Sequence, residues 1–228
     1  MEAEFISAQE IAAKCTADCA LDFWRYSSVV KHDSLVIPDG CRDLIFAQRT
    51  RWALRWFVSD LQLSTQRVHL TAETETLGIR LKPGVQIDER ALSSWIGTND
   101  PNSLAVGDTL DEFCTVFPST TDILDCLKSG IHSVKEAAST LGVSTRTLQR
   151  EVRKQTGVLP HFWMSLARVR LAGRHLNEES SAAETAILCG YADQAHLCRD
   201  IRRWFGVTPT RLVDHPTLLS QLGQTGYA

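Results

Sequence analysis

The sequence lacks the signatures of several large protein classes. Its first residues, Met1–Glu4, include two acids, whereas a secretory signal peptide begins with basic residues. No apolar run approaches the about 20 residues that span a bilayer. The sequence also has no G-x-S-x-G elbow, no P-loop, no dinucleotide-binding fingerprint and no H-E-x-x-H motif. We therefore expect a cytoplasmic protein that does not contact a membrane and is not an enzyme. A catalytic site assembled in space within the first half remains an alternative.

The cysteines do not form a metal-binding pattern. There are seven, an odd number, and they are scattered along the chain, which fits reduced thiols in a cytosol. Cys15 and Cys19 lie four residues apart on an expected helix, and with Cys41 they suggest a metal-responsive or redox-responsive sensor as an alternative function. A structural zinc site needs four ligands, and a second closely spaced pair is missing. We expect no metal and no cofactor, and we interpret the thiols as small apolar side chains.

Charge is distributed unevenly along the chain. The net charge of −3 by itself argues weakly against nucleic acid as a partner. However, residues 131–228 contain 12 Lys and Arg against 8 Asp and Glu, whereas residues 1–130 contain 12 against 19. A basic half beside an acidic half is typical of a DNA-binding module joined to a separate module. It also permits an inhibitory contact between the two halves.

The second half contains the same pattern twice. Ala138 and Gly142 recur 48 positions later as Ala186 and Gly190. The residues that recur 49 positions apart are Leu148 and Leu197, Arg150 and Arg199, Gly157 and Gly206, and Pro160 and Pro209. The change from 48 to 49 indicates that the second copy has one added residue, in its turn. A repeat of this kind predicts two copies of one structural unit.

The first copy has the pattern of a helix-turn-helix unit. Ser133 is a predicted N-cap, with a glutamate three residues later in a capping-box arrangement. Gly142 suits the sharp turn that follows, because a positive φ costs little only for glycine. Ser144 is the predicted cap of the second helix. This helix should bury Leu148 and Val152, which lie four residues apart.

The second copy predicts the same unit. Residues 182–189 form its supporting helix, residues 190–192 its turn, and Asp193 caps its second helix. The residues expected to face inward, at intervals of four, are Leu197, Ile201 and Phe205. Between the copies, residues 162–176 should form one continuous helix. It would hold the two units about 34 Å apart, which is one helical turn of DNA.

Arginine and glutamine dominate the outward faces of the two second helices. The outward residues of the first copy are Arg146, Gln149, Arg150 and Arg153, and those of the second are Gln194, Ala195, His196 and Arg199. Arg pairs with guanine and Gln with adenine in the major groove, so these faces favour direct reading of DNA. We expect Arg153, Lys154, Arg202 and Arg203 to contact phosphates. Such faces are usually only solvated, and His196 alone could be a packing residue. Two copies in register favour the DNA interpretation.

Residues from about 130 to 212 resemble the DNA-binding domain of the AraC/XylS family of bacterial transcription regulators. The matching motifs are residues 143–150, the series Arg168, Ala172 and Leu176, residues 189–191, and residues 205–209. The resemblance implies two helix-turn-helix units in successive major grooves, with activation as the commoner mode and RNA polymerase as a partner. By matched position it implies DNA contacts from Thr145, Arg146, Gln149, Arg150, Gln194, Ala195, His196 and Arg199.

The first half predicts a β-rich domain with flanking helices. Alternating and branched residues predict strands at 35–37, 44–46, 52–58, 67–70 and 77–81. Helices are expected at 7–18, 89–96 and 108–117. Turn-forming residues at 118–121 indicate the domain boundary, and residues 122–128 would open the second domain.

Two short motifs, residues 38–45 and residues 78–84, are similar to signatures of an N-terminal domain found in some AraC-type regulators. This resemblance implies a sensing or dimerising domain. Asp43, Arg80 and Lys82 are candidate ligand contacts there. A turn-capping Asp and charges at strand ends are the simpler interpretation of the same residues.

The sequence thus predicts an α+β protein. Residues 1–120 form a β-rich sensing or dimerisation domain, and residues 121–228 form an all-α domain of two helix-turn-helix units joined by a linker helix. The expected function is that of a DNA-binding transcription regulator, with double-stranded DNA as its partner. A small-molecule effector and a homodimer are further expectations. The effector, the operator and the choice between activation and repression stay open.

Overall fold

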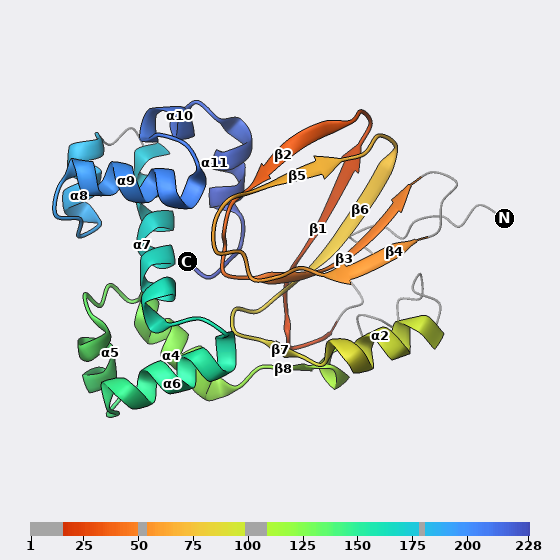
Figure 1. The fold of residues 1–228 in the computed structure, drawn as a ribbon, viewed down its shortest axis with the longest axis horizontal. Coiled ribbons are helices and arrows are strands. Elements are labelled where there is room, and N and C mark those ends of the chain that lie inside the picture. Colours follow the sequence, from red (N-terminus) through yellow and green to blue (C-terminus); the bar gives the residue numbers. More distant parts are fainter. Residues whose placement is uncertain (1–15, 50–53, 99–108, 178–180) are drawn as a thin grey trace. The chain divides into compact units, whose positions relative to one another are not determined.

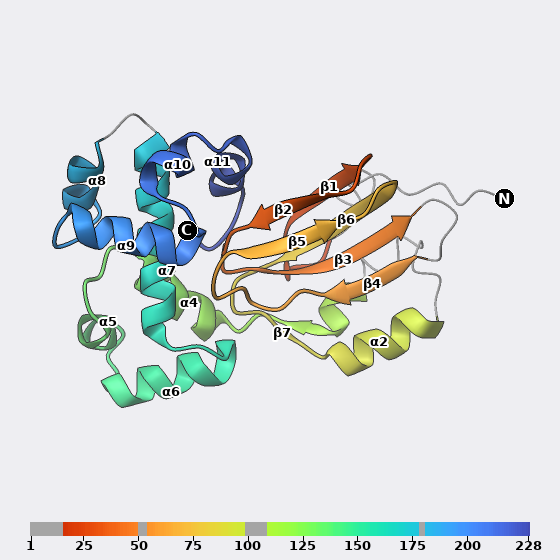
Figure 2. The same ribbon diagram turned by 45° about the horizontal axis from the view of Figure 1, so that its top comes forward.

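The fold is an α+β arrangement, as the sequence predicts: strands dominate the first half, and helices form the second (Figures 1 and 2). The computed structural model describes residues 16–49, 54–98, 109–177 and 181–228. Among these residues, no helix is both long enough and apolar enough to cross a membrane.

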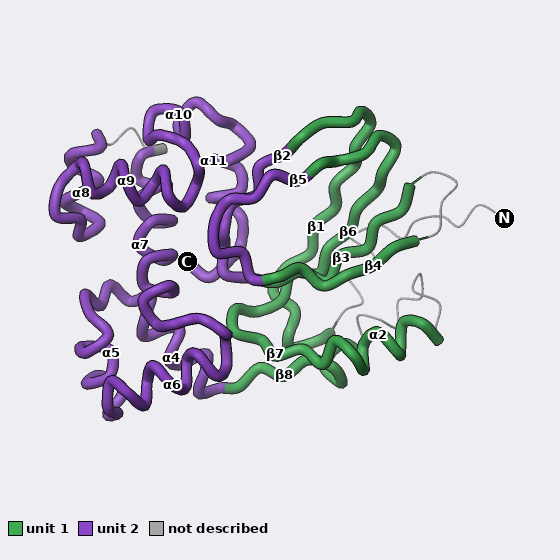
Figure 3. The backbone as a smooth tube through the Cα atoms, in the orientation of Figure 1, with its two compact units in different colours: residues 1–33, 42–60, 69–117 green, residues 34–41, 61–68, 118–228 purple. Residues whose placement is uncertain are grey.

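The chain folds into two compact units (Figure 3). Unit 1 contains residues 1–33, 42–60 and 69–117. Unit 2 contains residues 118–228 together with two segments from the first half of the sequence, residues 34–41 and 61–68. The helical unit is therefore assembled from three stretches of chain.

Unit 1 is built on a four-stranded antiparallel sheet with the order β1-β6-β3-β4. These strands are β1 (Ala20–Ser28), β6 (Thr74–Leu81), β3 (Arg42–Arg49) and β4 (Arg55–Val58). Ile79 of β6 lies between Phe23 of β1 and Leu44 of β3. Every residue of β6 from Leu77 to Leu81 is buried. This strand pairs with β1 on one edge and with β3 on the other.

Two shorter ladders complete the β-structure. β2 (His32–Val36) pairs with β5 (Gln66–Leu70), and β7 (Gln86–Ile87) pairs with β8 (Cys114–Thr115). The strands predicted at 44–46, 67–70 and 77–81 are confirmed as parts of β3, β5 and β6. The prediction at 35–37 overlaps the end of β2. Of the strand predicted at 52–58, the structure describes residues 54–58, and these contain β4. The strands β1, β7 and β8 have no counterpart among the predicted strands.

Two helical segments pack with the sheet of unit 1. α2 (Glu89–Thr98) buries Leu92 and Ile96, which confirms the helix predicted at 89–96. These side chains join the strand residues Leu44, Phe46 and Ile79 in one apolar core. A single 3-10 turn, η1 (Leu110–Glu112), adds its buried leucine to the same core.

The helix predicted at 108–117 is wrong. After η1, the chain extends into β8, where Cys114 lies opposite Ile87 of β7. The ladder with β7 satisfies backbone groups that a helix would have satisfied internally. In the helix predicted at 7–18, residues 7–15 lie outside the described residues, and residues 16–18 are not helical.

Unit 2 contains eight helices within the described residues. They are α4 (Pro118–Lys128), α5 (Val134–Thr140), α6 (Thr145–Thr156), α7 (Pro160–Asn177), α8 (Ala182–Leu188), α9 (Gln194–Phe205), α10 (Pro209–Val213) and α11 (Pro216–Gly223). The turn expected at 118–121 is instead the start of α4, with Pro118 as its first residue. Proline suits this position, because the first helical N–H has no partner within the helix.

The linker helix α7 is the centre of unit 2. It contacts α4 and α6 on the side of the first helix-turn-helix, and α8, α9, α10 and α11 on the side of the second (Figures 1 and 2). Trp163, Leu166, Val169 and Ala172 are buried along its length. The predicted linker at 162–176 is confirmed as part of this longer helix. Because one rigid helix packs against both helix-turn-helix motifs, α7 fixes the orientation of one motif relative to the other.

Arg170 of α7 attaches residues 34–41 to unit 2. Its side chain is completely buried, and its guanidinium donates to the carbonyl oxygens of Pro38, Leu222, Gln224 and Ala228 at 2.9 to 3.4 Å. A buried guanidinium is costly unless its N–H groups find acceptors. Here four backbone carbonyls supply them.

Gln221 of α11 holds the same segment. Its side-chain oxygen accepts the N–H of Ile37 at 2.9 Å, and its side-chain nitrogen donates to the carbonyl of Leu35 at 2.7 Å. The second segment, residues 61–68, reaches α9: both the N–H and the hydroxyl of Thr65 donate to the carbonyl oxygen of Trp204.

Candidate nucleic-acid interface

The first helix-turn-helix consists of α5 and α6. The hydroxyl of Ser133 accepts the N–H of Glu136 at 3.1 Å, which confirms the predicted cap of α5. The Glu136 carboxylate accepts the N–H of His132, one residue before the position expected for a capping box. Ser144 caps α6 by accepting the N–H of Thr147 at 3.1 Å.

The turn between α5 and α6 has a defined geometry. Gly142 has a φ of +67°, which the absence of a Cβ makes inexpensive. Val143 then donates its N–H to the carbonyl of Ala138 at 2.9 Å. Ala138 is buried, as are Leu148 and Val152 of α6, so the predicted inner face is confirmed.

The second helix-turn-helix, α8 and α9, repeats these interactions. Ser181 and Glu184 form a complete capping box at the start of α8. Tyr191 donates its N–H to the carbonyl of Ala186 at 2.9 Å, which is the bond made by Val143 and Ala138 in the first copy. Asp193 caps α9 by accepting the N–H of His196 at 2.6 Å, as predicted.

The added residue of the second copy lies in its turn. Val143 and Tyr191 are 48 residues apart and make the same backbone bond, whereas the caps Ser144 and Asp193 are 49 residues apart. The extra position is therefore Ala192. Both second helices contain twelve residues, and both end at a glycine with a positive φ, so the insertion leaves their length unchanged.

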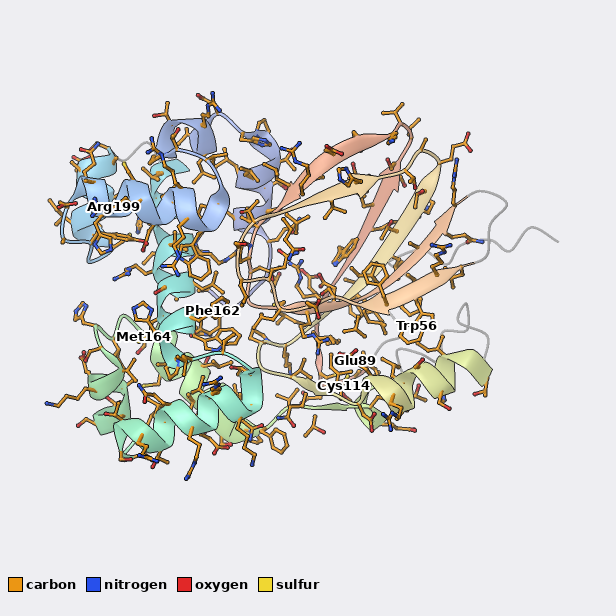
Figure 4. All side chains as sticks on the ribbon, viewed as in Figure 1. Trp56, Glu89, Cys114, Phe162, Met164 and Arg199 are labelled. Carbon is orange, nitrogen blue, oxygen red and sulfur yellow. The ribbon has the colours of Figure 1, made fainter. Side chains whose placement is uncertain are left out.

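The residues predicted to contact DNA are on the second helix of each unit. Arg146, Gln149, Arg150, Arg153 and Lys154 are exposed on α6, and Thr145 is half-buried at its start. On α9, the exposed residues are Gln194, Ala195, Arg199, Arg202 and Arg203; Figure 4 labels Arg199. For the arginines of this set, the structure records no ion pair with another described residue. Their charge is thus unneutralised within the described part of the protein, and their role as DNA contacts stays a prediction.

His196 differs from the other predicted contacts because its ring packs against the protein. It is half-buried and meets the ring of Tyr191 edge-on, with the centroids 5.1 Å apart. The guanidinium of Arg168 on α7 also lies over the Tyr191 ring. The same guanidinium approaches the Asp200 carboxylate of α9 at 3.5 Å. The sequence does not indicate this cluster, because its members come from three separate elements.

Burial keeps the Tyr191 hydroxyl neutral. Desolvation is the largest cause that raises the pKa of this phenol, and the Asp200 carboxylate adds to it, whereas Arg168 opposes both. An uncharged ring with a cation over its face and a histidine edge against it forms a stable packing unit. The cluster thereby connects the linker helix, the second turn and α9.

Trp204 is a buried residue of α9 that the predicted inner face omitted. Leu197, Ile201 and Phe205 are buried as predicted, and Trp204 lies beside them with its ring 5.3 Å from that of Phe162 on α7. Trp204 lies three residues after Ile201, so it falls on the same face of the helix as the residues spaced by four. Large aromatic side chains next to such a series are the signal that could have indicated it.

The ligand candidates of the first half have partners within unit 1. Arg80 and Asp43 lie opposite each other on β6 and β3 and form an ion pair at 3.1 Å, with each side chain mostly buried. Lys82 pairs with Asp18 at 2.9 Å. The cross-strand ion pair gives Asp43 and Arg80 a structural role that differs from the turn cap expected for the aspartate.

The three cysteines considered from the sequence have different outcomes. Cys15 lies outside the described residues, while Cys19 and Cys41 are buried thiols. Within the described ranges, no group of three or more His, Cys, Asp and Glu side chains is arranged to hold a metal ion. The absence of a bound metal thus stays a prediction.

Residues 137–215 match the family model of a helix-turn-helix domain. The regulator RipA of Corynebacterium glutamicum is 40% identical over 78 residues, which cover 34% of this chain and 24% of RipA. The transcriptional activator RhaS of Escherichia coli is 36% identical over 74 residues, covering 32% and 26% of the two chains. The family model thus identifies this segment as a helix-turn-helix domain. The resemblance inferred from the sequence motifs is confirmed, and the match spans about a quarter of the length of these relatives.

Two solved structures are similar to this chain at low sequence identity. A regulator with an AraC-type DNA-binding domain from Chromobacterium violaceum is 24% identical, with a TM-score of 0.40; the match covers 48% of this chain and 96% of that one. ToxT of Vibrio cholerae is 11% identical, with a TM-score of 0.45, and the match covers 89% and 97% of the two chains.

Proposed function

We propose that this protein is a sequence-specific DNA-binding transcription regulator that inserts α6 and α9 into two successive segments of the major groove. The observation that carries the proposal is the equivalence of the two helices. Each is twelve residues long, is capped by a side chain at its start, and presents exposed arginine on the side away from the core. An α-helix fits the major groove of B-form DNA.

The AraC-type domain supports an assignment of roles along each helix. In a helix-turn-helix, the early residues of the second helix reach base edges. We assign base reading to Arg146, Gln149, Arg150 and Arg199, with further DNA contacts from Thr145, Gln194, Ala195 and His196. Arg153, Lys154, Arg202 and Arg203 lie later in their helices and are assigned to phosphates, which position a protein without specifying sequence.

The remaining parts of the proposal concern the whole protein. We propose activation as its mode, with RNA polymerase as a partner, since one relative carries the name of a transcriptional activator. Unit 1 would sense a small molecule or pair two subunits, and we propose no catalytic activity for it. A regulator that acts on a bacterial chromosome works in the cytoplasm.

Selection of bound sequences from a random DNA pool tests the proposal with the full-length protein. We expect one motif with two half-sites about 10 base pairs apart. Arg150→Ala and Arg199→Ala should each relax base preference in a different half-site, whereas Arg90→Ala on α2 is the matched control outside the domain. Recovery of no motif would refute DNA reading. A motif unchanged by both variants would refute the assignment of the reading faces.

A further inference from the structure

Residues 34–41, the docked segment, belong to unit 2, although the chain on both sides of them belongs to unit 1 (Figure 3). β2 ends within this segment, and β3 begins directly after it, at Arg42. The sequence motif at residues 38–45 is therefore divided: its first four residues lie in unit 2, and the rest open β3 in unit 1. DNA reading by α6 and α9 does not account for this arrangement.

The docked segment contributes to the apolar core of unit 2. Ile37 is 2% exposed and belongs to the core cluster that contains Trp163 and Leu166 of α7. Gly40 has a φ of +80°, and a Cβ in its place would lie 2.6 Å from the Cβ of Tyr227 and 3.0 Å from the ring of Trp163. A side chain at this position would therefore push the segment away from α7.

Hydrogen bonds also hold the docked segment in unit 2. The side chains of Gln221 on α11 and Arg170 on α7 bind its backbone groups. Tyr227 adds a third attachment, because its N–H donates to the carbonyl oxygen of Asp39 at 2.8 Å. The Tyr227 hydroxyl donates in turn to the carbonyl oxygen of Leu124 on α4 at 2.8 Å. The segment is thus joined to α7, which contacts both helix-turn-helix motifs, and through Tyr227 to α4, which contacts the first.

The docked segment is also continuous with an inner strand of the sheet in unit 1. β3, which follows it, pairs with β6 on one edge and with β4 on the other. Asp43, the third residue after Gly40, forms the mostly buried ion pair with Arg80 of β6. Because a β-strand is nearly fully extended, β3 cannot move along its neighbours without moving the residues that precede it. A change in the sheet therefore acts on the attachments in unit 2.

We propose that the docked segment couples the sheet of unit 1 to the linker helix of unit 2. Release of residues 34–41 from α7 and α11 loosens β3, and rearrangement of β3 loosens the packing around α7. The coupling acts equally in both directions, as thermodynamic linkage requires. A small molecule that displaces Asp43 or Arg80 would reach α7 by this route. This regulatory role rests on the proposed function, whereas the coupling between the two units does not.

Hydrogen exchange of the full-length protein, followed by mass spectrometry, tests the coupling without DNA. Gln221→Ala removes both side-chain hydrogen bonds to the docked segment. We expect exchange of residues 34–41 to rise on the order of tenfold, because two hydrogen bonds are lost, and exchange of residues 42–49 in unit 1 to rise as well. Gln224→Ala is the matched control, since its side chain is exposed and Arg170 binds its backbone carbonyl. It should leave both ranges unchanged.

A variant in unit 1 tests the opposite direction. Gly78→Ala alters β6, the partner of β3, by placing a Cβ against the indole of Trp24. It should raise exchange in residues 34–41, whereas Gly97→Ala, whose Cβ meets no atom within 4 Å, should not. The coupling would be overturned if Gln221→Ala left exchange of residues 42–49 unchanged, or if Gly78→Ala accelerated exchange only within unit 1.

DNA obtained by sequence selection tests the regulatory role. In the original protein, bound DNA should slow exchange in α6 and α9 and also in residues 42–49, and Gln221→Ala should reduce the second effect alone. Slowing confined to unit 2 would overturn the regulatory role. Absence of slowing in α6 and α9 would refute the proposed function, and the regulatory role with it, while the exchange of the variants without DNA still decides the coupling.

Discussion

The guanidinium of Arg168 on α7 lies 4.7 Å from the centroid of the Tyr191 ring, in the turn that precedes α9. The same side chain approaches the Asp200 carboxylate on α9 at 3.5 Å. Tyr191 in turn packs against His196, in the first turn of α9. One residue of the linker helix thus holds both the turn and the helix assigned to the second half-site.

Replacement of Arg168 should therefore affect the two half-sites unequally. We expect Arg168→Ala to lower the free energy of unfolding by about 1 kcal/mol through the lost cation–π contact and ion pair. It should also weaken base preference in the α9 half-site and leave the α6 half-site intact. Arg168→Lys keeps the charge without the planar guanidinium. Its unfolding free energy and its base preference in the α9 half-site should lie between those of the original protein and those of Arg168→Ala. Urea denaturation and DNA selection measure these effects, and an equal loss in both half-sites would contradict the positioning role.

The base-reading and phosphate-binding assignments predict different changes. Arg150→Ala should cost about 1–3 kcal/mol in specific binding and relax preference at one base position. Arg203→Ala should weaken binding to all sequences and reduce the slope of log affinity against log salt by about 1, because one fewer counterion is released. Binding titrations at several salt concentrations on specific and unrelated DNA separate these effects. A base-specific effect of Arg203→Ala would show that the two roles are misassigned.

The N-caps of α6 and α9 lead to a stability prediction for each helix-turn-helix motif. Ser144→Ala and Asp193→Ala each remove a side-chain acceptor from a helix N-terminus, and each should cost about 1 kcal/mol of unfolding free energy. Ser139→Ala changes an exposed serine inside α5 and serves as the control. If the control lost as much stability as the cap variants, the recorded cap hydrogen bonds would not be the cause.

Two glycines of unit 1 provide a matched pair. A Cβ on Gly78 would lie 2.1 Å from the indole of Trp24, whereas a Cβ on Gly97 would meet no atom within 4 Å. We expect Gly78→Ala to destabilise unit 1 by about 1–3 kcal/mol, because the indole must move. Gly97→Ala lies in α2 and should be neutral or stabilising by up to about 1 kcal/mol. Equal stabilities in thermal denaturation would mean that Trp24 does not pack over Gly78 in solution.

Asp111 predicts an acid-sensitive step in unit 1. Partial burial raises the pKa of this carboxyl, but hydrogen bonds from Cys19 and Asp18 and the charge of Lys82 lower it, and the net direction is downward. Its contribution is therefore present above the pKa of the unfolded chain and lost as pH falls through the folded value, below about pH 4. Asp111→Asn should reduce this dependence in denaturation at several pH values. If Asp111→Asn lost unfolding free energy with falling pH as steeply as the original protein, the Asp111 carboxylate would not be the cause of the acid sensitivity.

The sequence predicted the helix-turn-helix domain in detail because its signals are local. Caps such as Ser144 and Asp193, the glycine turn, and apolar residues at intervals of four all act within a few residues of one another. The 48-residue and 49-residue offsets even located the insertion in the second turn, where the structure places Ala192. In the first half, β3 and β6 were found from their branched and apolar residues. The helix expected at 108–117 was wrong because β8 forms through pairing with β7, which lies far away in the sequence.

The sequence by itself determined the two helix-turn-helix units, the exposed position of most of their DNA-facing residues, and the β-rich character of the first half. Only the tertiary structure decided which distant segments come together: residues 34–41 with Arg170 and Gln221, residues 61–68 with α9, Arg80 with Asp43, and Cys19 with Asp111. Local hydrogen bonds and helical periodicity leave a record in neighbouring residues. Strand pairing and buried polar contacts depend instead on the three-dimensional path of the chain, which sets the partner of each side chain.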